Sequence, residues 1–248
     1  MLRSRDLVWD GCLNVRDLGG HPTEGGTETR FGEVVRADSV RQLTDEGWEA
    51  LVNYGVRTIV DLRSDEELEA DPPAELPVRV VHVPFFDDRA DVFEQVEAAS
   101  IRAANHAEAT REVYLIFLEH FRPNVAAAVE AVAEGLDGAV VVHCHGGKDR
   151  TGLVTAFLLR LAGVPIEEIA VDYALSEVRL RTRHEQWFAE AADEAELERL
   201  HRIAATPAES MVGVLEELER RYGSVESYLL AGGAREGIGE RVRARLTG

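Results

Sequence analysis

Short runs of apolar, β-branched residues alternate along the sequence with longer segments of helical pattern. Val56–Leu62 and Ala139–His143 are strongly apolar, which is typical of strands that are buried on both faces of a parallel sheet. Phe31–Ala37 and Val78–Val83 are two further predicted strands. Because strands separated by helices favour an α/β layer fold, we predict a mainly parallel central sheet flanked by helices.

Helices are expected between and after these strands. Capping boxes, in which a side chain and a backbone N–H group bond reciprocally, are predicted at Ser64–Glu67 and Thr206–Glu209. The predicted helices cover residues 44–54, 64 to before Pro72, about 90–121, 124–134, 151–161 and most of the last hundred residues.

The length, composition and charge of the chain exclude several classes of protein. The 248 residues contain no internal repeat and no low-complexity linker, so we expect one domain, 1–248. The formal net charge of −19 disfavours nucleic acid as a partner and requires any phosphate site to be locally positive. No apolar run has the length of a membrane span and no signal-like segment is present, which predicts a cytoplasmic protein without stable membrane insertion. An unconventional export route and the oligomeric state stay open.

One segment carries a chemical pattern. Cys144 follows the strand Ala139–His143 directly, so it lies at the carboxyl edge of the predicted sheet, where α/β proteins bind their ligands. Gly146 and Gly147 allow the next residues to curl into a nest of inward-facing N–H groups. The helix that begins near Thr151 adds its partial positive charge at the same point. The other cysteine, Cys12, is over a hundred positions away. The two cysteines therefore form neither a disulfide framework nor a zinc-ligand pattern.

These residue types suit phosphoryl transfer. At a helix N-terminus and beside Arg150, the pKa of the Cys144 thiol is expected well below its usual value of about 8.5, which makes it a candidate nucleophile. Arg150 presents a planar fork that matches phosphoryl oxygens. Thr151 can donate its hydroxyl to the sulfur. The predicted phosphate-binding residues are His145, Gly146, Gly147, Lys148, Asp149 and Arg150.

The loop also resembles a known signature. Residues His143 through Gly152 read HCHGGKDRTG, and this Cys-x5-Arg-Thr pattern is similar to the signature loop of cysteine-dependent protein tyrosine and dual-specificity phosphatases. Other patches between about residues 10 and 235 look like the bacterial tyrosine phosphatase B group. These patches are Asn14–Gly20, Asp61–Ser64, Asp172-Tyr173 with Ser176, Tyr222–Ser224 and Tyr228-Leu229.

The resemblance implies a metal-free, cofactor-free phosphatase with a cysteinyl-phosphate intermediate. It implies substrates among phosphotyrosine, phosphoserine or phosphothreonine in proteins, and phosphoinositides. It also implies a helical lid, for which about 90–121 is the candidate. A general acid is expected on a separate loop, where Asp87 aligns with the family's candidate position and Asp88 is its neighbour. Asp149 in the signature loop is the second candidate, ranked just below Asp87.

The same residues allow other interpretations. The uncertain acid leaves open a phosphate-binding module with negligible catalysis. A thiol redox or sulfur-transfer enzyme is disfavoured, because such chemistry has no need of Arg150 followed by Thr151. Arg16 is expected to be structural, whereas Arg36 and Arg63 are left between structural and pocket-lining roles.

Overall fold

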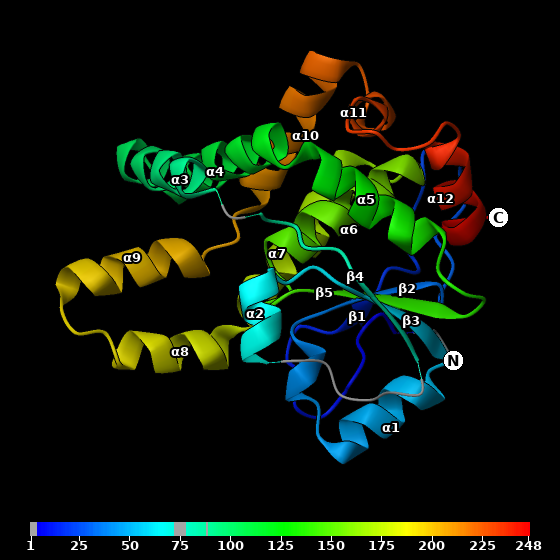
Figure 1. Cartoon of the computed structure of the whole chain (residues 1–248), viewed down its shortest axis with the longest axis horizontal. Helices are drawn as coiled ribbons and strands as arrows, with labels where there is room; N and C mark the ends of the chain where they lie inside the picture. Colours follow the sequence, from blue (N-terminus) through cyan, green and yellow to red (C-terminus); the bar gives the residue numbers. More distant parts are fainter. Residues whose placement is uncertain (1–3, 72–77, 88) are drawn as a thin grey trace.

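The computed structural model describes residues 4–71, 78–87 and 89–248. Within these residues the centre of the molecule is a five-stranded sheet with the order β1-β2-β5-β3-β4 (Figure 1). Strand β1 is antiparallel to β2, and the other neighbouring pairs are parallel. The prediction of a mainly parallel sheet is therefore confirmed. The strands are β1 (Arg16–Asp17), β2 (Val34–Ala37), β3 (Val56–Asp61), β4 (Arg79–His82) and β5 (Ala139–His143).

The helices lie on both faces of this sheet and at its carboxyl edge. The last hundred residues contain helices and no described strand after β5, as predicted. The described helices are η1 (Val40–Gln42), α1 (Asp45–Asn53), α2 (Asp65–Ala70), α3 (Ala90–Arg102), α4 (His106–His120), α5 (Arg122–Ala133), α6 (Arg150–Leu161), α7 (Ile166–Arg179), α8 (Arg181–Ala189), α9 (Glu194–Ala204), α10 (Ala208–Tyr222), α11 (Val225–Ala231) and α12 (Ile238–Leu246).

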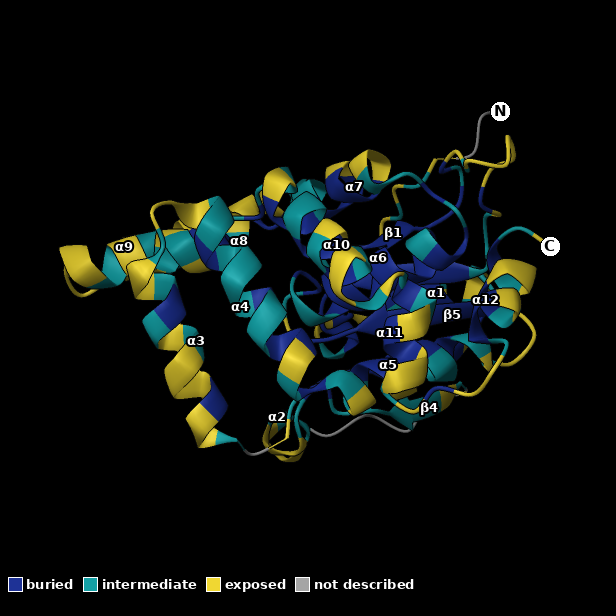
Figure 2. Ribbon diagram, turned by 90° about the horizontal axis from the view of Figure 1, so that it is seen from above, coloured by how far each residue is buried: buried dark blue, intermediate teal, exposed yellow. Residues whose placement is uncertain are grey.

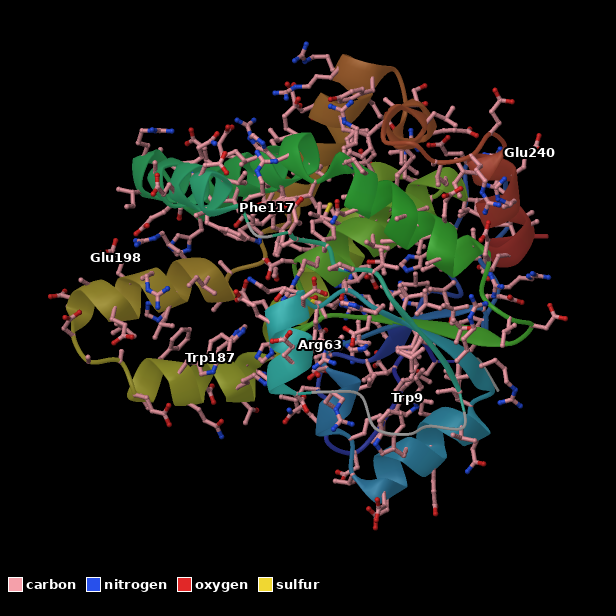
Figure 3. All side chains as sticks on the ribbon, in the orientation of Figure 1. Trp9, Arg63, Phe117, Trp187, Glu198 and Glu240 are labelled. Carbon is pink, nitrogen blue, oxygen red and sulfur yellow. The ribbon has the colours of Figure 1, made fainter. Side chains whose placement is uncertain are left out.

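Strand β5 shows why both faces of the sheet are covered. All five of its residues are buried. Val140 and Val142 belong to a large core shared with α5 and α6, whereas Ala139 and Val141 belong to a second core shared with α1. Trp9 fills this second core between the sheet and α1 (Figure 3). Because side chains alternate along a strand, a continuous apolar run is what two covered faces require.

The element boundaries follow the local signals closely. Strand β5 has the predicted limits, and β2 begins three residues later than the predicted start at Phe31. The helical stretch over 90–121 is two helices, because Asn105 caps α4 with a side-chain bond to the N–H of Glu108. The predicted capping box at Ser64 is confirmed, and its helix ends at Ala70, before Pro72.

The predicted capping box at Thr206 is wrong. Helix α10 begins at Ala208 with Pro207 as its N-cap residue, and no side chain caps it. The hydroxyl of Thr206 instead accepts a hydrogen bond from the N–H of Glu177 and donates one to the carbonyl of Ala174, at 3.1 and 3.2 Å. A tertiary contact with α7 thus takes the hydroxyl that the local pattern assigns to α10.

Two helical pairs, α3–α4 and α8–α9, project from the same side of the molecule (Figure 1). The view from above shows many exposed residues on α3 and α9, whereas the residues of β1, β2 and β5 are all buried (Figure 2). In the part of the chain that the structure describes, no helix combines the length and the apolar character that a bilayer span needs.

Candidate active site

The signature loop joins the end of β5 to the start of α6. Strand β5 ends at His143 and α6 begins at Arg150, so residues 144–149 lie at the carboxyl edge of the sheet. Gly147 has a φ of +64°, in the left-handed region that favours glycine. A Cβ atom there would come within 2.3 Å of the carbonyl oxygen of Ala37. The curl of the loop therefore depends on glycine at this position.

The outer side of the loop is bonded to the scaffold through its carbonyl groups. Ser39 donates its N–H to the carbonyl of residue 145 at 2.9 Å. The side-chain amide of Asn14 donates to the carbonyls of residues 146 and 147, at 3.2 and 3.0 Å. Arg36 donates to the carbonyl of residue 147 at 2.8 Å. Three consecutive carbonyl oxygens are thus turned toward the protein.

The backbone N–H groups of the same loop have no acceptor within the part of the protein that the structure describes. Among the described residues, none of the backbone N–H groups of residues 145–149 donates a hydrogen bond to a protein acceptor. Unpartnered N–H groups beside a helix N-terminus form an anion-binding nest. The predicted nest needs such unpartnered donors, and its binding of phosphate stays a prediction.

The sulfur and the threonine hydroxyl lie deep in this arrangement. Cys144 is only 2% exposed, and Thr151 is fully buried. Among the described residues the Thr151 hydroxyl has no hydrogen-bond partner, so the predicted hydrogen bond from Thr151 to the sulfur is not formed in this structure. The side-chain rotamer of a β-branched residue in a helix is set by its packing, which the sequence motif does not specify.

Arg150 is held by a residue that the sequence interpretation missed. Both of its Nη groups donate to the carboxylate of Glu67 in α2, one of them at 2.9 Å. Its guanidinium lies over the ring of Phe86, 5.3 Å from the ring centre. Burial alone would lower the pKa of Arg150, but the hydrogen bonds and charge of Glu67 raise it. The only sequence signal for Glu67 was its place in the capping box at Ser64.

Asp149 is bonded to the helix α4. The hydroxyl of Tyr114 donates to its carboxylate at 2.6 Å, and the hydroxyl of Tyr173 lies 2.9 Å from that of Tyr114. Lys148 forms an ion pair with the same carboxylate oxygen at 3.3 Å. Burial, followed by the charge of Asp149, raises the pKa of Tyr114 well above its usual value. Tyr114 is therefore a neutral hydrogen-bond donor, and sequence reasoning did not identify it.

The other predicted acid lies in a different setting. Asp87 is exposed in the connection between β4 and α3, directly after Phe86. Asp88 lies outside the described residues. Lys148, by contrast, is buried and donates from its ammonium group to the carbonyls of Ile203 and Ala205 at the end of α9.

A pocket of about 510 Å³ opens above residues 148–150. Its wall is mainly apolar and comes from α3 and α4, while α9 contributes two arginines. Phe117, labelled on α4 in Figure 3, is one of the wall residues. The residues that line the pocket are Phe86, Phe93, Val96, Glu97, Ser100, Ile101, Ala109, Thr110, Val113, Tyr114, Phe117, Lys148, Asp149, Arg150, Arg199, Arg202 and Ile203.

Arg16, Arg36 and Arg63, the three arginines considered in the sequence analysis, make buried ion pairs. Arg16 and Arg36 both bond Asp172 of α7, each at 2.9 Å. Burial would raise the pKa of Asp172, but these two guanidinium groups outweigh it and lower that pKa. Arg63 pairs with Asp61 at 2.8 Å, beside α2 (Figure 3). None of the three lines the pocket, so their contacts are those of scaffold residues.

The sequence matches the model of a known family along nearly its whole length. The match is to the tyrosine phosphatase family and covers residues 7–248. The chain belongs to this family. It is 31% identical over 223 residues to a tyrosine-protein phosphatase of Nostoc commune, which covers 86% of this chain and 73% of the relative. It is 27% identical to the triple specificity protein phosphatase PtpB of Mycobacterium tuberculosis, over 96% of this chain and 98% of the relative.

Among solved structures, TpbA of P. aeruginosa aligns with this tyrosine phosphatase family member at 19% identity. The alignment covers 81% of this chain and 86% of that chain, with a TM-score of 0.32. This likeness is too weak to add to the family assignment.

Proposed function

We propose that this member of the tyrosine phosphatase family hydrolyses phosphate monoesters through a cysteinyl-phosphate intermediate, with phosphotyrosine as its first substrate class. The observation that carries the proposal is the set of unpartnered N–H groups of residues 145–149. They lie between Cys144 and Arg150 at the N-terminus of α6. Such a cradle binds the phosphoryl oxygens next to a nucleophile.

The proposed reaction has two steps. The Cys144 thiolate attacks phosphorus, so that an S–P bond forms while the bond to the leaving oxygen breaks and an aspartate protonates that oxygen. Water then attacks phosphorus and gives a proton to the aspartate, which is now ionised, while the S–P bond breaks and releases inorganic phosphate and the thiolate. Arg150 and the loop N–H groups stabilise the charge on the phosphoryl oxygens in both steps. We assign to the unpartnered hydroxyl of Thr151 the stabilisation of the departing thiolate.

The burial of Cys144 restricts what reaches it. Because Cys144 is only 2% exposed, we propose that the phosphoryl group alone enters the loop to reach the sulfur, while the rest of the substrate stays in the pocket above. We propose that residues 1–248 form one phosphatase domain in which α3 and α4 act as the lid of that pocket. The phenyl rings of Phe86 and Phe117 in the wall suit an aryl phosphate.

The positive side chains around the pocket favour the binding of strongly anionic substrates. Lys148, Arg150, Arg199 and Arg202 border it in a chain of net charge −19. A local cluster of cations attracts a phosphate dianion despite the field of the whole molecule. Phosphoserine or phosphothreonine in proteins and phosphoinositides are therefore proposed as further substrates, and the relative named a triple specificity phosphatase supports testing more than one class.

The chain offers a matched pair of variants, because it has two cysteines. We expect Cys144→Ser to abolish turnover of p-nitrophenyl phosphate and of a panel of phosphopeptides and phosphoinositides, with phosphate binding retained. Cys12→Ser, which changes a partly buried cysteine outside the loop, should keep the activity. Phosphate release by each variant, without added metal, is the measurement.

The same assay distinguishes an enzyme from a phosphate-binding module with negligible catalysis. Turnover that survives Cys144→Ser would refute the assignment of the nucleophile. A wild-type protein that binds inorganic phosphate but releases none from any substrate of the panel would instead be a phosphate-binding module.

A further inference from the structure

Arg150 uses only part of its hydrogen-bonding capacity on Glu67. The contact takes one N–H from each Nη group, at the end of the guanidinium. A guanidinium carries five N–H donors in one plane. Among the described residues, the Nε–H of Arg150 has no hydrogen-bond partner, and Arg150 borders the pocket. The edge formed by Nε–H and the second N–H of Nη2 therefore stays available for a bidentate anion.

Two residues, one at its end and one on its face, hold the guanidinium of Arg150 in place. Glu67 holds its end, and the ring of Phe86 covers one face at 5.3 Å. The side chain of Arg150 is 13% exposed, so few other orientations are open to it. A guanidinium held in this way loses little further freedom when it binds phosphate.

Glu67 is itself fixed by the capping box of α2. Its carboxylate oxygen Oε2, which accepts from Arg150, also accepts from the N–H of Ser64 at 2.8 Å. Its own N–H donates to the hydroxyl of Ser64 at 3.3 Å. At the other end of α2, Arg63 donates to the carbonyl of Asp71 at 3.0 Å. The carboxylate thus has a defined position before any substrate binds.

Glu67 stays ionised over the pH range in which enzymes usually work. Burial would raise the pKa of Glu67, but the hydrogen bonds and charge of Arg150 lower it to about 2. The carboxylate is ionised at neutral pH, and its contact with Arg150 is a charge-assisted, bidentate one.

We infer that Glu67 is a positioning residue that holds the end of the Arg150 guanidinium, so that its Nε–Nη2 edge is oriented for the phosphoryl group. This inference rests on the proposed function. A carboxylate this close to a phosphate dianion repels it, so Glu67 does not strengthen binding of the ground state. Its contribution appears where orientation matters most, in the transition state.

The first test is Glu67→Gln, which keeps an oxygen acceptor for Ser64 and removes the charge that holds Arg150. We expect kcat/KM for p-nitrophenyl phosphate to fall by roughly 10- to 100-fold. The inhibition constant of vanadate, which adopts the five-coordinate geometry of the transition state, should rise by a similar factor. The inhibition constant of inorganic phosphate should change by less than about threefold, because the lost orientation is offset by reduced repulsion.

Two further variants test geometry against charge. Glu67→Asp keeps the negative charge but shortens the side chain, so it should lose activity as well. Glu66→Gln removes a charge from an exposed neighbour on the same helix and should behave like the wild type. Thermal unfolding of each variant shows that the fold is kept, and if Glu67→Gln does not fold, Glu67→Asp carries the test.

The outcomes are distinct. Unchanged kcat/KM in both Glu67 variants, or tighter phosphate binding with increased turnover, would overturn the inference and make Glu67 a bystander or a competitor of substrate. Equal weakening of vanadate and phosphate would also overturn it, since that pattern belongs to a general disturbance of the loop. The proposed function fails separately, when the wild-type protein is inactive or Cys144→Ser is active.

Discussion

At the scale of single residues, the two aspartates considered for the general acid differ in their partners. Asp149 accepts a hydrogen bond from Tyr114 and pairs with Lys148, and both contacts fix the orientation of its carboxylate. Asp87 has neither partner and follows Phe86, a pocket residue. These surroundings keep Asp87 as our first candidate and suggest that Asp149 shapes the loop.

Substitution of each aspartate separates the two roles. We predict that Asp87→Asn lowers kcat by about 10²- to 10⁴-fold for a phosphate ester with a poor leaving group. The effect should be much smaller for p-nitrophenyl phosphate, whose leaving group needs little protonation. Asp149→Asn should reduce both activities by similar factors. Steady-state kinetics on a series of aryl phosphates measures the difference, and a leaving-group dependence confined to Asp149→Asn would reverse the assignment.

At the scale of elements, α4 is tied to the signature loop through a buried hydroxyl. Tyr114 lies on α4, its partner Asp149 precedes α6, and Tyr173 lies on α7. One hydrogen-bonded chain therefore joins a helix of the candidate lid to the loop and to a core helix. The position of α4 is thereby coupled to the loop it covers.

Removal of that hydroxyl should loosen the lid. Tyr114→Phe leaves the buried hydroxyl of Tyr173 and the half-buried carboxylate of Asp149 without their hydrogen bond, so we expect a loss of about 1–3 kcal/mol in the free energy of unfolding. We also expect faster amide hydrogen exchange in α3 and α4. Tyr222→Phe, which removes an exposed hydroxyl bond to Glu119 at 3.3 Å, is the matched control. Unchanged exchange in α3 and α4 of Tyr114→Phe would show that this contact does not hold the lid.

At the scale of the whole molecule, one buried carboxylate joins two strands near the N-terminus to a helix more than 130 residues later in the chain. Asp172 of α7 bonds Arg16 of β1 and Arg36 of β2, and Arg36 also holds the carbonyl of Gly147. The edge of the sheet, a helix and the signature loop therefore share one charge cluster. Removing one partner of a buried pair leaves the others uncompensated.

We predict that Asp172→Asn lowers the free energy of unfolding by about 3–5 kcal/mol. Because the pKa of Asp172 is lowered in the folded protein, its contribution is present above the unfolded pKa of about 3.9 and is lost as the pH falls below it. Denaturant unfolding at pH 7 and at pH 3 measures both effects, with Glu168→Gln on the exposed side of α7 as control. A loss at pH 7 no larger than the control's would contradict the prediction.

Much of the fold and part of the candidate site were predictable from local signals. The limits of β5, the cap at Ser64 and the order of strands and helices follow from patterns within a few residues, where backbone geometry and side-chain alternation act. The loop from Cys144 to Arg150 was predictable for the same reason, since its parts are adjacent in the chain.

Contacts between distant segments were decided by tertiary packing alone. Glu67 and Arg150 are 83 positions apart, and Tyr114 and Asp149 are 35 apart. No local pattern distinguishes these side chains from exposed ones, because a carboxylate or a hydroxyl finds its partner only after the helices pack. Packing against α7 also gave the hydroxyl of Thr206 partners outside its own helix. Local patterns therefore specify the strands, the helices and the loop with its chemistry, whereas the packing of distant segments selects the side chains that hold that loop in place.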